Sequence, residues 1–470
     1  MRQFLLTKKK DFEIDWIQID ILEFRLFCQP ELEVTCEKYK EKEILLLDSL
    51  YDWEIPEKTN KEILNELIKL DTFEKCLDRL ARYTGEYVLI YRNGNKIYLL
   101  NDMGAQSEIY YDTEYTTFGS QAKLIGKVIE IIPHTESDAY NFYTSEKFVE
   151  KKLTIGTTTK YKNVKHLLPN KYIDVDEKIV KRFYPTRPLE KITTNDAAEK
   201  VVRMMKGYIR AIAERKKIAI GVTAGYDSRV LFFASLNVEC KYFVNKNKQK
   251  KENHPDLIIS KRLAEMYGCP FEIIKNKDIA EELPDNVDLP IFETHKAEKI
   301  YLNHIYLGGG ISEIARNYYG SWNNLDANDL AFINGYNGIS FVIDEYKKWL
   351  NDKRIFQRYG YNLTDMFYWE ERIGVWGAKG RTMQNAIGIY GVTPYCSRDL
   401  ITTMLSTPRK DRNHYINKLY YKILLNMSKD ALKIPINPMK KTKIIRYMIR
   451  FKVYDLYRYL GLKFRYLQYK

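Results

Sequence analysis

The chain lacks several features that would identify common protein classes. It has no apolar run of the roughly 18 residues that a membrane-spanning helix needs, and its opening residues hold no apolar segment of signal-peptide length. Its six cysteines form no Cys-x-x-Cys pair, which argues against a zinc site or a disulfide scaffold. It contains no GxxxxGK[ST] loop, and no GxGxxG follows a strand, so the usual phosphate loops of kinases and dinucleotide-binding proteins are excluded. These absences predict a cytoplasmic protein.

Negative charge is scarce near the end of the chain. The whole sequence has a formal net charge of +14. Residues 440–470 contain ten lysines and arginines but only one acid, Asp455, and aromatic residues are interleaved with them. This composition fits an amphipathic helix on the core with a solvated basic face. It also fits peripheral contact with an anionic membrane, a polyanionic substrate or nucleic acid.

The length of 470 residues indicates two or three domains. Residues 1–130 are mainly strand-like, with one helical segment at 60–83 and a hairpin signal at 92–96. The stretch 183–196 contains two prolines and a polar run, which indicates a linker and then a helix capped by Asn or Asp. We therefore predict one domain at residues 1–190 and a second at 191–470.

The second part alternates short apolar strands with helices, which predicts a parallel α/β sheet that binds ligands at the carboxyl ends of its strands. One strand, at 218–222, is followed by the turn Thr-Ala-Gly-Tyr-Asp-Ser and a helix from Arg229. Backbone N–H groups and the positive end of the helix dipole favour an anion on such a turn. Asp227 would repel a bare anion, so the turn predicts an anion bridged by a divalent cation.

The turn resembles the Ser-Gly-Gly-x-Asp-Ser pyrophosphate loop of N-type ATP pyrophosphatases, with Thr223 in place of Ser and Ala224 in place of the first Gly. Three further stretches resemble elements of asparagine synthetases in the same order along the chain: 85–111, 308–320 and 393–405. The chain is thus similar over most of its length to an asparagine synthetase. The resemblance implies an α/β protein with an N-terminal-nucleophile-type β-sandwich and a doubly wound parallel-sheet ATP pyrophosphatase domain with added helices.

The resemblance also implies the site residues, with ATP and Mg²⁺ as cofactors. It implies catalytic roles for Asp227, Glu313 and Arg316. It implies that Asp227 and Glu313 bind the metal. The nucleotide-binding residues implied are Thr223, Ala224, Gly225, Tyr226, Asp227, Ser228 and Arg229. Each has an ordinary structural alternative: Asp227 as a helix cap, Tyr226 in packing, Arg229 as a solvated helix charge, and Arg316 in an ion pair with Glu313.

Two departures from the family pattern matter. Glutamine-hydrolysing members begin with a Cys nucleophile, whereas this chain begins Met1-Arg2-Gln3, so we expect an inactive, structural amidotransferase domain. Ser312 stands where the synthetases have a metal-binding Asp. The pattern Gly-x-x-Glu-Ile-x-Arg-x-x-Tyr at 310–319 is similar to one found in divergent members of the family. Those members amidate sugar acids in surface polysaccharides.

The predicted function is that of an AMP-forming carbon–nitrogen ligase, which adenylates a carboxylate and transfers the acyl group to an amine. The first candidate substrate is a sugar acid of surface polysaccharide. A second hypothesis is intramolecular amide closure, as in lasso-peptide or β-lactam formation. A third hypothesis is a catalytically inactive scaffold. A tRNA-modifying pyrophosphatase fits the charge but not the amidotransferase-like domain. The sequence leaves open whether the protein forms a homodimer and whether residues 440–470 make a peripheral membrane contact.

Overall fold

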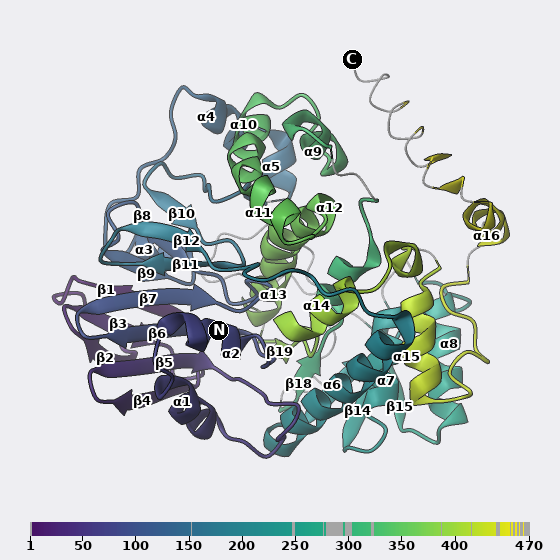
Figure 1. The fold of residues 1–470 in the computed structure, drawn as a ribbon. Coiled ribbons are helices and arrows are strands. Elements are labelled where there is room, and N and C mark those ends of the chain that lie inside the picture. Colours follow the sequence, from purple (N-terminus) through teal and green to yellow (C-terminus); the bar gives the residue numbers. More distant parts are fainter. Residues whose placement is uncertain are drawn as a thin grey trace. The chain divides into compact units, whose positions relative to one another are not determined.

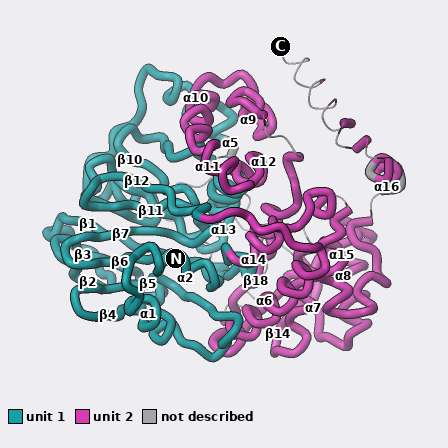
Figure 2. The backbone as a smooth tube through the Cα atoms, viewed as in Figure 1, with its two compact units in different colours: residues 1–186, 279–294, 369–398 teal, residues 187–278, 295–368, 399–470 magenta. Residues whose placement is uncertain are grey.

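The chain folds into two compact units, which Figure 2 colours separately. The computed structural model describes residues 2–151, 153–246, 250–275, 277–278, 295–296, 303–320, 324–386, 388–414, 416–438 and 442–451, and the positions 453, 454, 456, 457, 460 and 464. The first unit contains residues 1–186 and 369–398, and the second contains 187–278, 295–368 and 399–470. The domain boundary predicted at residue 190 stays a prediction.

Two antiparallel sheets form the centre of the first unit (Figure 1). The first sheet has the strand order β10 (Val164–His166), β8 (Tyr110–Asp112), β9 (Thr117–Gly119), β1 (Phe4–Thr7), β3 (Phe24–Cys28) and β2 (Ile17–Ile21). The second has the order β12 (Ile179–Arg182), β11 (Lys171–Asp174), β7 (Lys96–Asn101), β6 (Tyr87–Asn93), β5 (Lys42–Asp48) and β4 (Val34–Tyr39). The predicted β-rich first part is therefore observed as two sheets.

Side-chain alternation along the strands explains why the two sheets stack. On β5, Leu45 and Leu47 join a core that also contains residues of the first sheet, whereas Ile44 and Leu46 point to the opposite face. Helices α1 (Asn60–Ile68) and α2 (Phe73–Leu80) cover that opposite face. The remaining helical and strand elements of this unit are α3 (Ala122–Ile125), α4 (Asp138–Thr144), α5 (Glu146–Lys151), the π-helix η3 (Tyr368–Gly377, from its second residue), α13 (Ala378–Ala386) and β19 (Gly391–Val392).

Two local predictions can be compared with this unit. The hairpin at 92–96 is confirmed, because β6 and β7 pair across a turn in which Gly94 has a φ of +60°. The single helical segment predicted at 60–83 is wrong in detail, since α1 ends at Ile68 and α2 starts after Thr72. The Thr72 hydroxyl accepts a hydrogen bond from the N–H of Lys75 and so starts a new helix.

The second unit contains a parallel sheet in the order β15 (Phe271–Lys275), β14 (Cys240–Lys246), β13 (Ile218–Gly221) and β18 (Ile305–Leu307). A short antiparallel pair is formed by β16 (Lys277–Asp278) and β17 (His295–Lys296). The helices of this unit are α6 (Thr194–Arg215), α7 (Tyr226–Ala234), α8 (Pro255–Met266), α9 (Ala327–Ile333), α10 (Ser340–Trp349), α11 (Lys353–Arg358), α12 (Leu363–Phe367), α14 (Arg398–Leu405, from its second residue), α15 (Lys418–Met427) and α16 (Thr442–Arg450), with the 3₁₀ helices η1 (Gly310–Arg316), η2 (Leu350–Asp352) and η4 (Arg409–Arg412).

Together these elements confirm a mixed α/β protein with antiparallel sheets, a parallel sheet and many helices. One predicted helix start needs correction. Helix α6 is capped by Thr193, not by Asn or Asp. The Thr193 residue is extended, and its hydroxyl accepts a hydrogen bond from the N–H of Asp196, which satisfies one of the free donors of the first helical turn.

Candidate functional site

The turn that follows residue 222 lies where the order of the strands in the parallel sheet reverses. From β13 the chain moves outward through β14 to β15, and later returns to add β18 on the other side of β13. The loops after β13 and β18 therefore leave the carboxyl edge of neighbouring strands. In open α/β sheets, ligands bind at such a topological switch point. The predicted strand and helix are present as β13 and α7, but α7 begins at Tyr226, three residues before the predicted start at Arg229, so Tyr226, Asp227 and Ser228 form its first turn.

Asp227 connects the two loops. Its Oδ1 accepts a hydrogen bond of 2.6 Å from the Ser312 hydroxyl, and its Oδ2 lies 3.0 Å from the guanidinium of Arg316. The loops approach so closely that a Cβ added at Gly309 would lie 2.7 Å from the Cβ of Asp227. Only glycine leaves room for this contact, so position 309 determines how tightly the two loops pack.

Glu313 extends the same cluster. It accepts a hydrogen bond of 2.5 Å from the Tyr368 hydroxyl and lies 3.8 Å from the Arg316 guanidinium. Arg316 is largely buried, and although burial opposes its charge, Asp227 and its other neighbours raise the pKa of its guanidinium above the ordinary value. The arginine is therefore a fixed cation between two carboxylates.

The implied Mg²⁺ fits one of its two predicted ligands better than the other. Magnesium at phosphates commonly uses one or two carboxylates together with phosphate oxygens and water. Asp227 is partly exposed beside the turn and can contribute in that way. A single ion shared by Asp227 and Glu313 does not fit, because the Arg316 guanidinium contacts both. Among the residues that the structure describes, no group of three or more His, Cys, Asp or Glu could hold a metal alone.

The backbone of the turn presents its N–H groups to oxygen acceptors. The N–H of Thr223 donates to the Ser228 hydroxyl, and that of Gly225 donates to the Thr223 hydroxyl. The N–H of Ala224 donates to a carboxylate, Asp256, at 3.0 Å. A turn that binds one carboxylate oxygen through its backbone has the donors an anion needs.

The carboxylate that contacts the turn, Asp256, comes from a different helix. It lies in the first turn of α8, whose cap is His254. Lys250 lies 3.0 Å from the other carboxylate oxygen. Although burial acts in the opposite direction, the Ala224 N–H and Lys250 hold the pKa of Asp256 below its ordinary value. No local sequence pattern relates Asp256 to Ala224.

Arg229 points away from the turn into the protein interior. Its guanidinium is fully buried and donates to the carbonyl oxygens of Ala431, Ile434 and Pro435 at 2.6 to 3.2 Å. Burial lowers its pKa to about 10. The segment it holds also reaches the turn, because the N–H of Asn437 donates to the carbonyl of Ala224. Arg229 is therefore a positioning residue for the 431–437 segment.

We expect Arg229→Met to lower the free energy of unfolding by about 2–4 kcal/mol, because three buried carbonyl groups lose their donor. The segment 431–437 should become sensitive to protease. Arg203→Met, at an exposed position on α6, is the matched control and should change neither property. Denaturant unfolding and limited proteolysis measure both effects. Equal proteolysis of the two variants would contradict the positioning role.

The candidate Tyr226 and two basic residues, Lys433 and Arg398, have structural contacts. Tyr226 is buried and packs on the ring of Tyr420 at 5.3 Å between centroids. Lys433 pairs with Asp430, and Arg398, in the first unit, donates to the amide oxygen of Asn170. None of these contacts assigns a catalytic role to the residue.

No family model and no curated protein matches the chain. The assignment of function therefore depends on the geometry of the turn and on the motif resemblance. In the part of the chain that the structure describes, none of the helices combines the length and the apolar character required to cross a bilayer.

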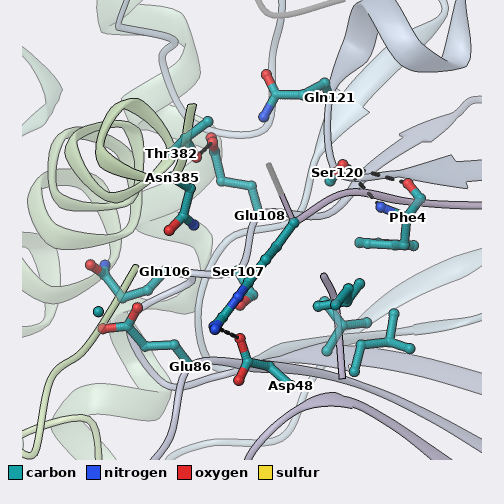
Figure 3. Close-up of a pocket in the computed structure, with 15 residues that line it drawn as sticks. Phe4, Asp48, Glu86, Gln106, Ser107, Glu108, Ser120, Gln121, Thr382 and Asn385 are labelled. Atoms are coloured by element: carbon teal, nitrogen blue, oxygen red, sulfur yellow. Dashed lines mark hydrogen bonds and ion pairs between the residues drawn. The ribbon is translucent and has the colours of Figure 1, made fainter. Parts of the chain in front are cut away.

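A separate cavity lies inside the first unit (Figure 3). Its carboxylates are each paired with a base: Asp48 with Arg2 at 2.5 Å, Glu86 with Arg381 at 2.7 Å, and Glu108 with Lys379 at 3.5 Å. Its described lining residues are Arg2, Phe4, Leu32, Leu47, Asp48, Glu86, Val88, Gln106, Ser107, Glu108, Ser120, Gln121, Thr382, Asn385 and Gly391. This described lining includes no cysteine, so no thiol nucleophile is positioned there.

His166 lies next to this cavity and is completely buried. It stacks on Tyr110, and its Nε2 is 3.7 Å from Glu108, but neither ring nitrogen has a hydrogen-bond partner among the described residues. Burial, helped by Lys379, lowers the pKa of His166 to about 4, although Glu108 acts in the opposite direction. The folded protein therefore keeps this imidazole neutral.

We expect the His166 ring to make the protein less stable in acid. Between about pH 6.5 and pH 4 the unfolded chain binds a proton at this residue that the folded protein does not, so stability falls as the pH falls. His166→Gln should reduce that loss by about 3 kcal/mol, since the pKa differs between the two states by about 2.5 and each unit corresponds to about 1.4 kcal/mol. Urea unfolding across this pH range measures it. Parallel pH profiles of variant and parent would contradict the prediction.

Proposed function

We propose that the protein is an ATP-dependent amide ligase that releases AMP and pyrophosphate, with the turn at 223–228 as its nucleotide site. The observation that carries the proposal is the meeting of this turn and the loop after β18 at Asp227, at the switch point of the parallel sheet. The resemblance of the turn and of the stretch 308–320 to asparagine synthetases supports an N-type ATP pyrophosphatase fold for the second unit. The two stacked antiparallel sheets support an N-terminal-nucleophile-type fold for the first.

In the proposed first step, a substrate carboxylate oxygen attacks the α-phosphorus of ATP and pyrophosphate departs. The N–H groups at the start of α7 and the hydroxyls of Thr223 and Ser228 bind the pyrophosphate. Arg316 supplies a buried positive charge beside Asp227, where negative charge develops on the leaving group. When bound through Asp227, Mg²⁺ supplies additional neutralisation of the phosphate charge.

In the proposed second step, an amine attacks the acyl carbon of the acyl-adenylate, an amide forms and AMP leaves. The proton lost by the amine goes to a carboxylate oxygen of Glu313, which the Tyr368 hydroxyl orients through its hydrogen bond. The Arg316 guanidinium lies 3.8 Å from this carboxylate and helps to hold it in place. Glu313 is thus proposed as a general base, and not as a metal ligand shared with Asp227.

The carboxylate is proposed to be a sugar acid of a surface polysaccharide, on the resemblance of 310–319 to enzymes of that class. The amine is proposed to be ammonia or an amino compound that does not come from glutamine. The paired carboxylates and the thiol-free lining of the cavity in the first unit support this assignment, within the residues described there. All six cysteines are free, which supports a reducing, cytoplasmic compartment.

One specific observation favours a second candidate, a catalytically inactive scaffold. Ser312 replaces an acidic residue, and Asp227 already has Ser312 and Arg316 as partners. These contacts of Asp227 hold the two loops together without any bound nucleotide. The scaffold and the ligase make opposite predictions for ATP turnover.

The test is a screen of uronic acids with ammonium or simple amines for pyrophosphate release from ATP. The ligase gives AMP and pyrophosphate in equal amounts, and only with the correct carboxylate. Oxygen-18 in that carboxylate should appear in AMP, because the acyl-adenylate breaks at the acyl carbon. Unlabelled AMP, or ADP and phosphate, would remove the adenylation mechanism. Absence of ATP binding would favour the scaffold.

A further inference from the structure

Apolar side chains at the C-terminal end of the second unit are unusually exposed. On and just after α16, Ile444, Tyr447 and Phe451 have relative exposures of 63%, 62% and 68%. The described residues beyond the helix continue this pattern, with exposed Val453, Leu456, Tyr457, Leu460 and Phe464. Single exposed apolar residues are ordinary, but several large ones in one short segment indicate an interaction surface, although Tyr454 between them is buried.

The first three exposed residues have helical spacing and a basic row beside them. Positions 444, 447 and 451 are separated by three and four residues, so they share one face of a helix. Positions 443, 446 and 450 have the same spacing, one residue earlier, and each is Lys or Arg. The helix α16 thus combines an exposed apolar stripe with an adjacent basic stripe.

We infer that α16 and the residues that follow it bind the surface of an anionic phospholipid membrane. This surface is formed by other residues than the nucleotide site, and the inference does not depend on the proposed reaction. Charge complementarity carries the choice of partner, since residues 440–470 contain ten lysines and arginines and one acid. A helix of this type lies in the plane of the membrane interface, with its apolar side chains inserted and its basic side chains at the lipid phosphates.

The chemistry of the apolar stripe favours lipid over nucleic acid. Bases of single-stranded nucleic acid stack on aromatic rings and on arginine planes. Half of the exposed apolar residues here are aliphatic: Ile444, Val453, Leu456 and Leu460. Aliphatic side chains give no stacking surface but gain free energy in hydrocarbon. The aromatic residues Tyr447 and Phe451 suit the interface between headgroups and acyl chains.

The full chain should co-sediment with vesicles of phosphatidylglycerol and phosphatidylcholine, and not with vesicles of phosphatidylcholine alone. Replacement of Lys443, Arg446 and Arg450 by Gln should weaken binding by about 100-fold, because each basic residue near an anionic surface contributes about a fivefold factor. The double variant Ile444→Ser with Phe451→Ser should weaken it by at least about tenfold. Added salt should weaken the binding of the parent.

A matched control replaces three exposed lysines elsewhere, Lys127, Lys206 and Lys261, by Gln. It makes the same change in net charge and should bind vesicles as the parent does. Circular dichroism checks that all variants are folded. The inference is overturned by equal loss in the control, by undiminished binding of the α16 variants, or by equal binding to uncharged vesicles. Tighter binding to an RNA oligonucleotide that displaces the protein from vesicles also overturns it.

Discussion

We expect Gly309→Ala to reduce ATP-dependent pyrophosphate release by about 100-fold, because a small misplacement of a site can have an effect of this size. A Cβ at this position would lie 2.7 Å from the Cβ of Asp227, a contact that is shorter than atoms tolerate. Gly309 has a φ of −115°, so alanine fits the backbone and the effect comes from the contact alone. The two loops must separate, and the bonds of Asp227 to Ser312 and Arg316 lengthen.

Gly310→Ala is the matched control for this prediction. It makes the same change one residue later, but the added Cβ has no atom within 4 Å. Both substitutions reduce the conformational freedom of the unfolded chain equally, so that effect cancels in the comparison. Gly309→Ala should also lower the free energy of unfolding by about 1–3 kcal/mol relative to Gly310→Ala. Equal activity of the two variants would show that the loop contact is irrelevant to turnover.

The second large effect is expected at Asp227. Asp227→Ala should abolish Mg²⁺-dependent ATP binding and reduce turnover by on the order of 1000-fold, since it removes the carboxylate that joins the two loops. Among the described residues, it also leaves Arg316 with Glu313, at 3.8 Å, as its only anionic partner. Loss of one member of a largely buried pair destabilises by about 3 kcal/mol. Calorimetry with ATP and Mg²⁺ measures the binding, and denaturant unfolding measures the stability.

A second variant separates these two effects. In the double variant Asp227→Ala with Arg316→Ala, the unpaired charge is gone, so part of the lost stability should return. Nucleotide binding should stay absent, because neither substitution restores the carboxylate. Undiminished Mg²⁺-dependent ATP binding by Asp227→Ala would place the nucleotide site elsewhere in the protein.

Some of this site could be predicted from a short stretch of sequence. A buried strand, a turn of small and hydroxyl residues and an apolar helix start are all encoded between residues 218 and 236. Each depends on local backbone preference and side-chain periodicity. The hairpin at Gly94 was predictable for the same reason, because its conformation depends on the glycine itself.

The contacts of Arg229 could not be predicted in this way. Its partners are backbone carbonyl groups, which every residue has, so no sequence pattern marks Ala431, Ile434 and Pro435 as acceptors. Asp256 presents the opposite difficulty. Its place near the start of a helix is typical of a residue with a purely local role, and only the three-dimensional arrangement reveals its bond to the N–H of Ala224. Both residues depend on contacts between distant segments.

The distance in sequence between these partners has a consequence for biosynthesis. Ser312 follows Asp227 by 85 residues, and Pro435 follows Arg229 by 206. Ordering the turn thus requires closure of long chain loops, which is slow compared with local folding. A chain still on the ribosome lacks the acceptors of Arg229 until residue 435 has been added and has emerged. We therefore expect the nucleotide turn to mature only after residue 435 has emerged from the ribosome, so that a nascent chain shorter than this binds no ATP and gains no stability from the ligand.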